Sequence, residues 1–250
     1  VLCGTAPRSR HCLPFRFRPT IDKAIMQSSS SVPHSAQSEV HAQLAGLVER
    51  HLAAPFRKPY ADYNREACDA SLARYRERTD GVPLILDSCC GVGESSIALA
   101  RAFPDHYVIG VDQSADRLAR RIADKAADRL PENLDLVRAD LVDYWRLLDE
   151  AGVRVARHYL LYPNPWPKIG HLARRWHGHP VFPAMLRLGG VFECRSNWCI
   201  YVQEMAQAIT LATGLSVPVD AYCPETVLTP FERKYLASGH ALYRVRVTLA

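Results

Sequence analysis

Apolar and polar residues follow a helical period in the N-terminal third of the chain. Apolar residues recur at three- and four-residue spacing between Ser38 and Leu52, which predicts a helix with Ser38 as its N-cap. A second helix is predicted from Asp62 to about Tyr75. We expect residues 39–78 to form an N-terminal helical appendage packed on the main domain.

From Val82 onward, short apolar runs alternate with helical segments. The pattern predicts strands over residues 82–87, 107–111, 133–140 and 159–161, and helices over residues 95–100 and 114–130. Such alternation is typical of an α/β fold with a mostly parallel sheet and helices on both faces. We expect this domain to occupy residues 79–250.

Residues 1–38 lack any hydrophobic period and are rich in Arg, Pro and Ser. We expect a disordered leader, in which Met26 is the natural start of an over-extended sequence. The alternative, a transit peptide, is disfavoured because Pro14 and Pro19 interrupt any amphipathic helix.

Composition narrows the class of protein. A chain of 250 residues with 48% apolar residues suits one α/β domain with additions, and no apolar run approaches the ~20 residues that span a bilayer. None of the eight cysteines forms a Cys-x-x-Cys pair, so free thiols in a reducing, cytoplasmic setting are expected. His177 and His179 have no third ligand nearby, so no metal is expected.

Positively charged residues are concentrated between Glu150 and Glu193. This stretch has no acidic residue but contains six Lys or Arg and four His residues. It fits a surface that binds a polyanion such as nucleic acid. A solvated basic face, paired with acids elsewhere in the fold, remains the alternative.

Two segments carry candidate chemistry. Three prolines within residues 163–167 forbid a helix or a continuing central strand, so the chain must leave the sheet as a stiff loop carrying Trp166, Lys168 and His171. The turn at residues 88–94 carries Gly91 and Gly93 and lies between a predicted strand and a predicted helix. It lacks the third glycine of a dinucleotide site, which argues against NAD.

Acids end three successive predicted strands, at Asp87, Asp112 and Asp140. Ligands of open α/β sheets bind at the carboxyl ends of the strands. Acceptors without a phosphate cradle suit the ribose and adenine of S-adenosylmethionine. The alternative is that all three acids serve as helix caps.

The loop also carries a family resemblance. The run Tyr-Pro-Asn-Pro-Trp-Pro-Lys at residues 162–168, followed by His171, Arg174 and Arg175, resembles the signature of TrmB-type tRNA (guanine-N7)-methyltransferases. Residues 195–201 and 229–234 resemble the family's Thr-Asp-Trp-x-x-Tyr and Thr-x-Phe-Glu segments, in the same order. The resemblance implies a class I, Rossmann-like, doubly wound methyltransferase. Such an enzyme methylates N7 of a guanine in the tRNA variable loop, as a monomer or homodimer.

The resemblance also implies roles for particular residues. The cofactor would be bound by Asp87, Gly91, Gly93, Asp112, Asp140 and Asn164, the last of which is also the catalytic position. The tRNA would be bound by Lys168, His171, Arg174, Arg175, Asn197, Thr229, Phe231 and Glu232. N7 carries a lone pair and no proton, so positioning should supply most of the rate. Glu232 would accept hydrogen bonds from the Watson–Crick edge of guanine, and the basic residues would neutralise phosphates. Trp166 would either stack on a base or act as a structural wedge.

The chain departs from the family pattern. Asn164 and Asn197 stand where the family has Asp, Cys89 replaces the first motif glycine, and Gly170 and Ala173 replace a basic pair. The two Asn residues predict a weakened or altered guanine site. Two alternatives remain: a methyltransferase for another RNA position or a small molecule, and a catalytically silent RNA-binding protein.

Overall fold

The computed structural model describes residues 30–78, 81–123 and 130–250. Within them, one seven-stranded sheet has the strand order β3-β2-β1-β4-β5-β7-β6. The strands are β1 Leu84–Ser88, β2 Tyr107–Asp112, β3 Leu134–Arg138, β4 Arg157–Leu161, β5 Gly190–Ser196, β6 Val219–Tyr222 and β7 Leu242–Leu249. The helices are α1 Leu44–Ala53, α2 Asp62–Arg78, α3 Glu94–Ala102, α4 Ala115–Ala123, α5 Leu141–Glu150, α6 Phe182–Arg187, α7 Cys199–Thr213 and α8 Pro230–Ala237, with 3-10 turns η3 Ile169–Arg174 and η4 Trp176–Gly178.

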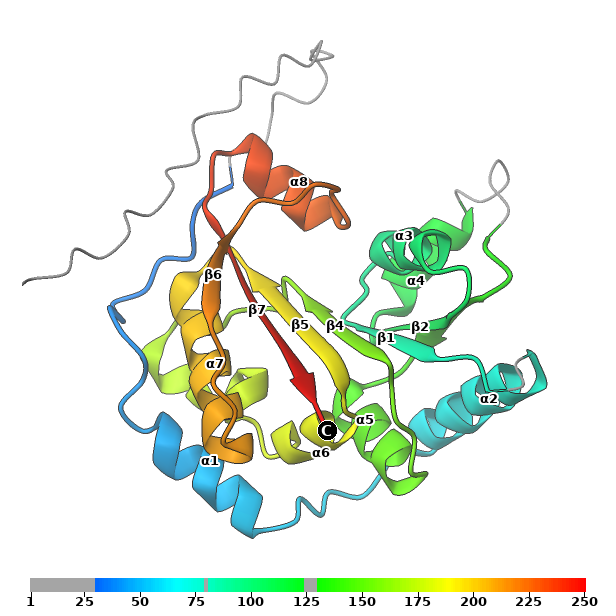
Figure 1. Ribbon diagram of the computed structural model, residues 1–250, viewed down its shortest axis with the longest axis horizontal. Helices are drawn as coiled ribbons and strands as arrows, with labels where there is room; N and C mark the ends of the chain where they lie inside the picture. Colours follow the sequence, from blue (N-terminus) through cyan, green and yellow to red (C-terminus); the bar gives the residue numbers. More distant parts are fainter. Residues whose placement is uncertain (1–29, 79–80, 124–129) are drawn as a thin grey trace, which may run out of the picture.

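Helices cover both faces of this sheet (Figure 1). Among the described residues there are two hydrophobic clusters. The smaller one joins α3 to Ile85 and Val108, and the larger one joins α5, α6 and α7 around Trp145 and Phe192. The pairings from β3 through β5 are parallel, and β7 is antiparallel to both of its neighbours. The α/β fold expected from the sequence is therefore confirmed, with one antiparallel strand near the edge.

Strand order reverses between β1 and β4, which lie side by side at the centre of the sheet. Ser88 pairs with Leu160, so the turn after β1 and the loop after β4 leave the sheet at the same edge. This is the kind of topological switch point at which open α/β sheets bind ligands.

A close approach between α3 and β2 shapes this edge. A Cβ atom at Gly110 of β2 would lie 2.2 Å from Ser96 Oγ of α3. Only glycine leaves room there, and the contact brings the first turn of α3 against the ends of β1 and β2.

The N-terminal segment differs from expectation. Ser38 is not a cap: α1 begins at Leu44, and its N-cap Gln43 makes no side-chain capping bond. Residues 30–38 contain no helix or strand, yet they make defined contacts with the main domain, described below, instead of lying free. In Figure 1 this segment runs from the end of α8 past α7 to α1.

Other expectations stand as follows. α2 extends to Arg78, beyond the predicted end at Tyr75. The predicted helix over residues 114–130 is observed as α4, but residues 124–129 lie outside the described residues, as does the predicted leader through residue 29. The domain boundaries at residues 38 and 78 stay a prediction. No helix in the described part of the chain is long and apolar enough to cross a bilayer.

Candidate cofactor and substrate site

Asp87 lies fully buried beneath the turn after β1. Its Oδ2 accepts hydrogen bonds from the hydroxyls of Ser95 and Ser96, each at 2.6 Å, while Oδ1 has no hydrogen-bond partner among the described residues. Burial raises the pKa of Asp87 to about 6, even though both serine hydrogen bonds oppose the shift. The first turn of α3 therefore holds this carboxyl group in place and leaves one acceptor oxygen free.

Asp112 ends β2 and ties the glycine turn to that strand. Its Oδ2 accepts from the Gly91 amide at 3.0 Å and its Oδ1 from the Ser114 amide at 2.9 Å. Gly91 and Gly93 both have positive φ, at 62° and 80°, and Gly93 is the N-cap of α3. The turn thus brings free amides at the start of α3 toward the same edge as Asp112.

Asp140 acts as a helix cap, as the structural alternative anticipated. Its Oδ1 accepts from the Val142 amide at 2.9 Å at the start of α5, and its own amide donates to Asn64 Oδ1 of α2. The carboxylate is half-buried and remains at the edge beside β3. A capping role leaves lone pairs available, so cofactor binding by Asp140 stays a prediction.

The loop after β4 is strained at two positions. Tyr162 and Trp166 have φ of 51° and 46°, in the left-handed region that side chains with a Cβ disfavour. Asn164 is exposed, and its Oδ1 accepts from the Trp166 amide at 3.3 Å. Lys168 is also exposed. The loop therefore presents an amide and an ammonium group to solvent.

Trp166 packs within the loop. The guanidinium of Arg174 lies 4.9 Å from the centre of the Trp166 ring system, and the His171 ring meets it edge-on at 5.6 Å. Desolvation and the nearby charges of Arg174 and Lys168 lower the pKa of His171. His171 is therefore mainly neutral at pH 7, and the positive charge of this surface comes from Lys168 and Arg174.

Two residues that the sequence predicts to bind tRNA, Arg175 and Glu232, are buried and paired inside the protein. Arg175 is fully buried and pairs with Glu204 at 2.5 Å, so it cannot reach a phosphate at the surface. Glu232 is also fully buried. Its Oε1 accepts from Tyr162 Oη at 2.7 Å and from Arg195 at 3.0 Å, and its Oε2 accepts from the Leu228 amide. Arg175 thus donates to internal acceptors and Glu232 accepts from internal donors, so a direct contact of either side chain with tRNA stays a prediction that this arrangement does not favour.

Thr229 and Glu232 have a local structural role instead. Thr229 is the N-cap of α8, and its hydroxyl accepts from the Glu232 amide at 2.9 Å. Asn197 is buried with its amide 3.1 Å from His240 Nδ1, whereas Phe231 is 47% exposed and stacks on Tyr235. Of the predicted residues on this side, Phe231 is the one most open to a ligand.

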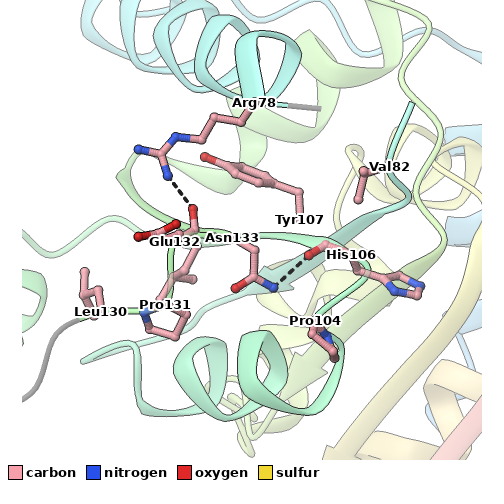
Figure 2. A pocket seen from close by; sticks show the side chains of 10 residues that line it. Arg78, Val82, Pro104, His106, Tyr107, Leu130, Pro131, Glu132 and Asn133 are labelled. Atoms are coloured by element: carbon pink, nitrogen blue, oxygen red, sulfur yellow. Dashed lines mark hydrogen bonds between the residues drawn. The ribbon is translucent and has the colours of Figure 1, made fainter. Parts of the chain in front are cut away.

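A cavity of about 760 Å³ lies at the other edge of the sheet, near the start of β2 and β3 (Figure 2). Asn133 donates to the His106 carbonyl at 2.8 Å across one side of it, and Arg78 donates to the Glu132 carbonyl. None of the predicted site residues lines this cavity.

Sequence comparison places the chain among methyltransferases. A family model described as putative methyltransferase matches residues 82–245. Three curated relatives are each called tRNA (guanine-N(7)-)-methyltransferase. The protein of Pseudoalteromonas atlantica is 31% identical over 64% of this chain and 70% of its own length. That of Saccharophagus degradans is 30% identical over 65% and 74%, and that of Acinetobacter baylyi 26% identical over 64% and 67%.

Structural comparison supports the same fold. The match to the crystal structure of the 16S rRNA methyltransferase KamB has a TM-score of 0.54 at 21% identity. It covers 77% of this chain and 95% of the KamB chain. An antibiotic-related methyltransferase has a TM-score of 0.53 at 15% identity, covering 77% and 97%. At these identities the likeness concerns the fold.

Proposed function

The chain belongs to the family of putative methyltransferases whose model matches residues 82–245, and on that premise we propose that it methylates N7 of a guanine in tRNA, using S-adenosylmethionine. Its curated relatives carry the name of that activity. The observation that carries the proposal is the exit of the Pro-Asn-Pro-Trp-Pro-Lys loop beside the turn after β1, at the switch point of the sheet. The finer proposal is a guanine of the variable loop, modified in the cytoplasm.

The residues at this edge fit the cofactor. Asp112 keeps free lone pairs that can accept from the ribose hydroxyls, and the amides at the start of α3 approach the same space. Asp87 supports the turn from below. When bound, S-adenosylmethionine supplies an electrophilic methyl group.

The rest of the task is to hold guanine in line with that methyl group. N7 needs no base, so rate depends on orientation and on exclusion of competing poses. Asn164 Oδ1 and the exposed Phe231 can orient the base, and Lys168 with Arg174 can hold adjacent phosphates. Glu232 need not touch guanine, since it accepts hydrogen bonds from Tyr162 and Arg195.

A second candidate function is RNA binding with weak or no methyl transfer. It is favoured by the uncharged Asn164 and Asn197 and by the full internal engagement of Glu232. Both candidate functions use the same cofactor site, and they differ in whether the methyl group is transferred to RNA.

The test is transfer of label from methyl-labelled S-adenosylmethionine to unmodified bulk tRNA, with ribosomal RNA offered in parallel. We expect label in tRNA, and loss of both cofactor binding and transfer in Asp112→Ala. Asp105→Asn, an exposed acid in the α3–β2 turn, is the matched control and should behave as wild type. Cofactor binding without transfer to tRNA would contradict the proposal and favour the second candidate.

A further inference from the structure

The buried Arg175 holds the substrate loop by its backbone. Its Nε donates to the Trp166 carbonyl at 3.2 Å and its Nη2 to the Lys168 carbonyl at 3.4 Å, while Nη1 pairs with Glu204. One planar guanidinium therefore connects two loop carbonyls to a carboxylate in α7, which uses its fixed fork of donors.

The segment before α1 completes this arrangement. Ser35 Oγ donates to the Pro167 carbonyl at 2.5 Å, and Gln37 Oε1 accepts from Arg175 Nη2 at 3.0 Å. Three successive carbonyls, of residues 166, 167 and 168, are thus held by two side chains from outside the loop. We call Ser35, Gln37, Arg175 and Glu204 the carbonyl clamp.

Glu204 anchors the clamp. It lies fully buried in the middle of α7 and accepts from Arg175 and His177 on Oε2, and from Gln37 and the His41 amide on Oε1. Burial alone would raise its pKa, but the interactions with His177, and after them those with Arg175, outweigh burial and lower the pKa of Glu204 to about 2. A charged carboxylate with four donors is a fixed point for the segment, the loop and α7 together.

The loop needs such external support. The prolines at 163, 165 and 167 have no amide to donate, so the loop depends on its carbonyls for hydrogen bonding. Trp166 also adopts a left-handed conformation that persists only where the surroundings over-determine it.

We propose that Arg175 and Glu204 are positioning residues for the methyl transfer, acting through the carbonyl clamp. The clamp fixes the backbone of residues 166–168 and thereby the directions of Asn164 and Lys168, which touch the substrate. This inference rests on the proposed function. Ser35 and Gln37 lie outside every helix and strand, so they can be changed without removing a core side chain.

The first test uses Ser35→Ala and Gln37→Ala, singly and together, with the exposed Ser38→Ala of the same segment as the matched control. Because small misplacements of reacting groups are costly, we expect the double variant to lose about tenfold in kcat. KM for S-adenosylmethionine should stay within about twofold, since the cofactor acids are untouched. Ser38→Ala should match wild type in both parameters.

A second variant separates positioning from charge. Arg175→Lys keeps the positive charge beside Glu204 but loses the planar fork that reaches both carbonyls. We expect its kcat to fall at least as far as that of the double variant. A merely structural role would lower the melting temperature and leave kcat of the folded protein unchanged, and that result would overturn the proposal.

A readout independent of activity is amide hydrogen exchange over residues 164–172. We expect faster exchange there in the Ser35→Ala/Gln37→Ala variant than in wild type, with exchange in β1 and β2 unchanged. If wild type transfers no methyl group to tRNA, the proposed function fails, while exchange still tests the clamp. Wild-type exchange in the double variant would overturn the clamp itself.

Discussion

Cys89 occupies a backbone conformation that suits glycine. It directly follows β1, has a φ of 62°, and lies in the same turn as Gly91, whose amide donates to Asp112. In the left-handed region a Cβ atom crowds the following carbonyl oxygen, at a cost of about 1 kcal/mol or more. Cys89 stands where the family pattern has glycine, and its left-handed backbone conformation explains why a residue with a Cβ atom is unfavourable there.

We predict that Cys89→Gly is more stable than Cys89→Ala, by about 1 kcal/mol. Both variants remove the sulfur and its packing, so their difference isolates the strain of the Cβ atom. In ordinary positions the order is reversed, because glycine costs more backbone entropy. Denaturant unfolding measures both free energies, and a more stable alanine variant would show that the position is not strained.

Asn164 is the position of the loop at which the chain lacks a negative charge of the family pattern. It is exposed, and its side-chain oxygen is already directed at the Trp166 amide. A carboxylate there would keep that hydrogen bond and add negative charge beside a guanine that becomes cationic on methylation.

We predict that Asn164→Asp raises kcat about tenfold, because a fixed opposite charge stabilises the developing positive charge. Asn164→Ala should lower kcat, since it removes the acceptor altogether. Steady-state methylation of tRNA measures both. Equal rates for Asp and Asn would mean that charge at this position is not limiting.

Sequence patterns predict the strands of the sheet more reliably than the roles of the site residues. The strands β1, β2 and β3 are predictable because each is a short segment rich in apolar residues with an acid at its end or within two residues of it, namely Asp87, Asp112 and Asp140. The resemblance of the Thr-x-Phe-Glu motif predicts a substrate site, although a Thr followed three residues later by Glu is also the signature of a capped helix. Residue types alone do not separate these two readings.

We predict that Thr229→Ala destabilises the protein by about 1 kcal/mol through loss of the α8 cap. The exposed Thr226, three residues earlier, is the control and should tolerate Ala with little change. If Thr229 is structural, kcat of the folded variant stays near wild type. A large loss of kcat without loss of stability would restore the substrate-binding reading.

The contacts that organise the whole molecule were beyond prediction. Ser35 meets Pro167 across 132 positions and Gln37 meets Glu204 across 167, and neither distance leaves a local pattern. Glu204 is distinguishable in sequence as the one charged residue of α7, but only the fold reveals its partners. The same holds for Arg175, which is buried while its neighbour Arg174 is exposed, although the two are alike in sequence.

Buried titratable groups predict the response of the whole molecule to acid. Burial lowers the pKa of His158 to about 3 and that of His179 to about 4, and it also lowers the pKa of His177. The unfolded chain therefore takes up protons first below pH 6.5, so stability falls as pH falls. Glu204 adds to this loss between about pH 4.5 and pH 2, because its folded pKa is depressed.

We predict that the free energy of unfolding drops between pH 7 and pH 4, with about 3 kcal/mol from His158 alone. Asp87 opposes this trend, since its raised pKa makes the folded state the better proton binder between pH 6 and about 4. Asp87→Asn should therefore steepen the loss. Denaturant unfolding at a series of pH values tests both, and a flat profile in wild type would contradict the assignment of neutral buried histidines.

The most direct test of the central claim is the identity of the methylated nucleoside. Unmodified tRNA is incubated with the protein and methyl-labelled S-adenosylmethionine, digested to nucleosides and resolved by chromatography and mass spectrometry. We predict that the label appears as 7-methylguanosine, and that it disappears with Asp112→Ala but not with Asp105→Asn. Label in any other nucleoside, or none while the cofactor binds, would contradict it.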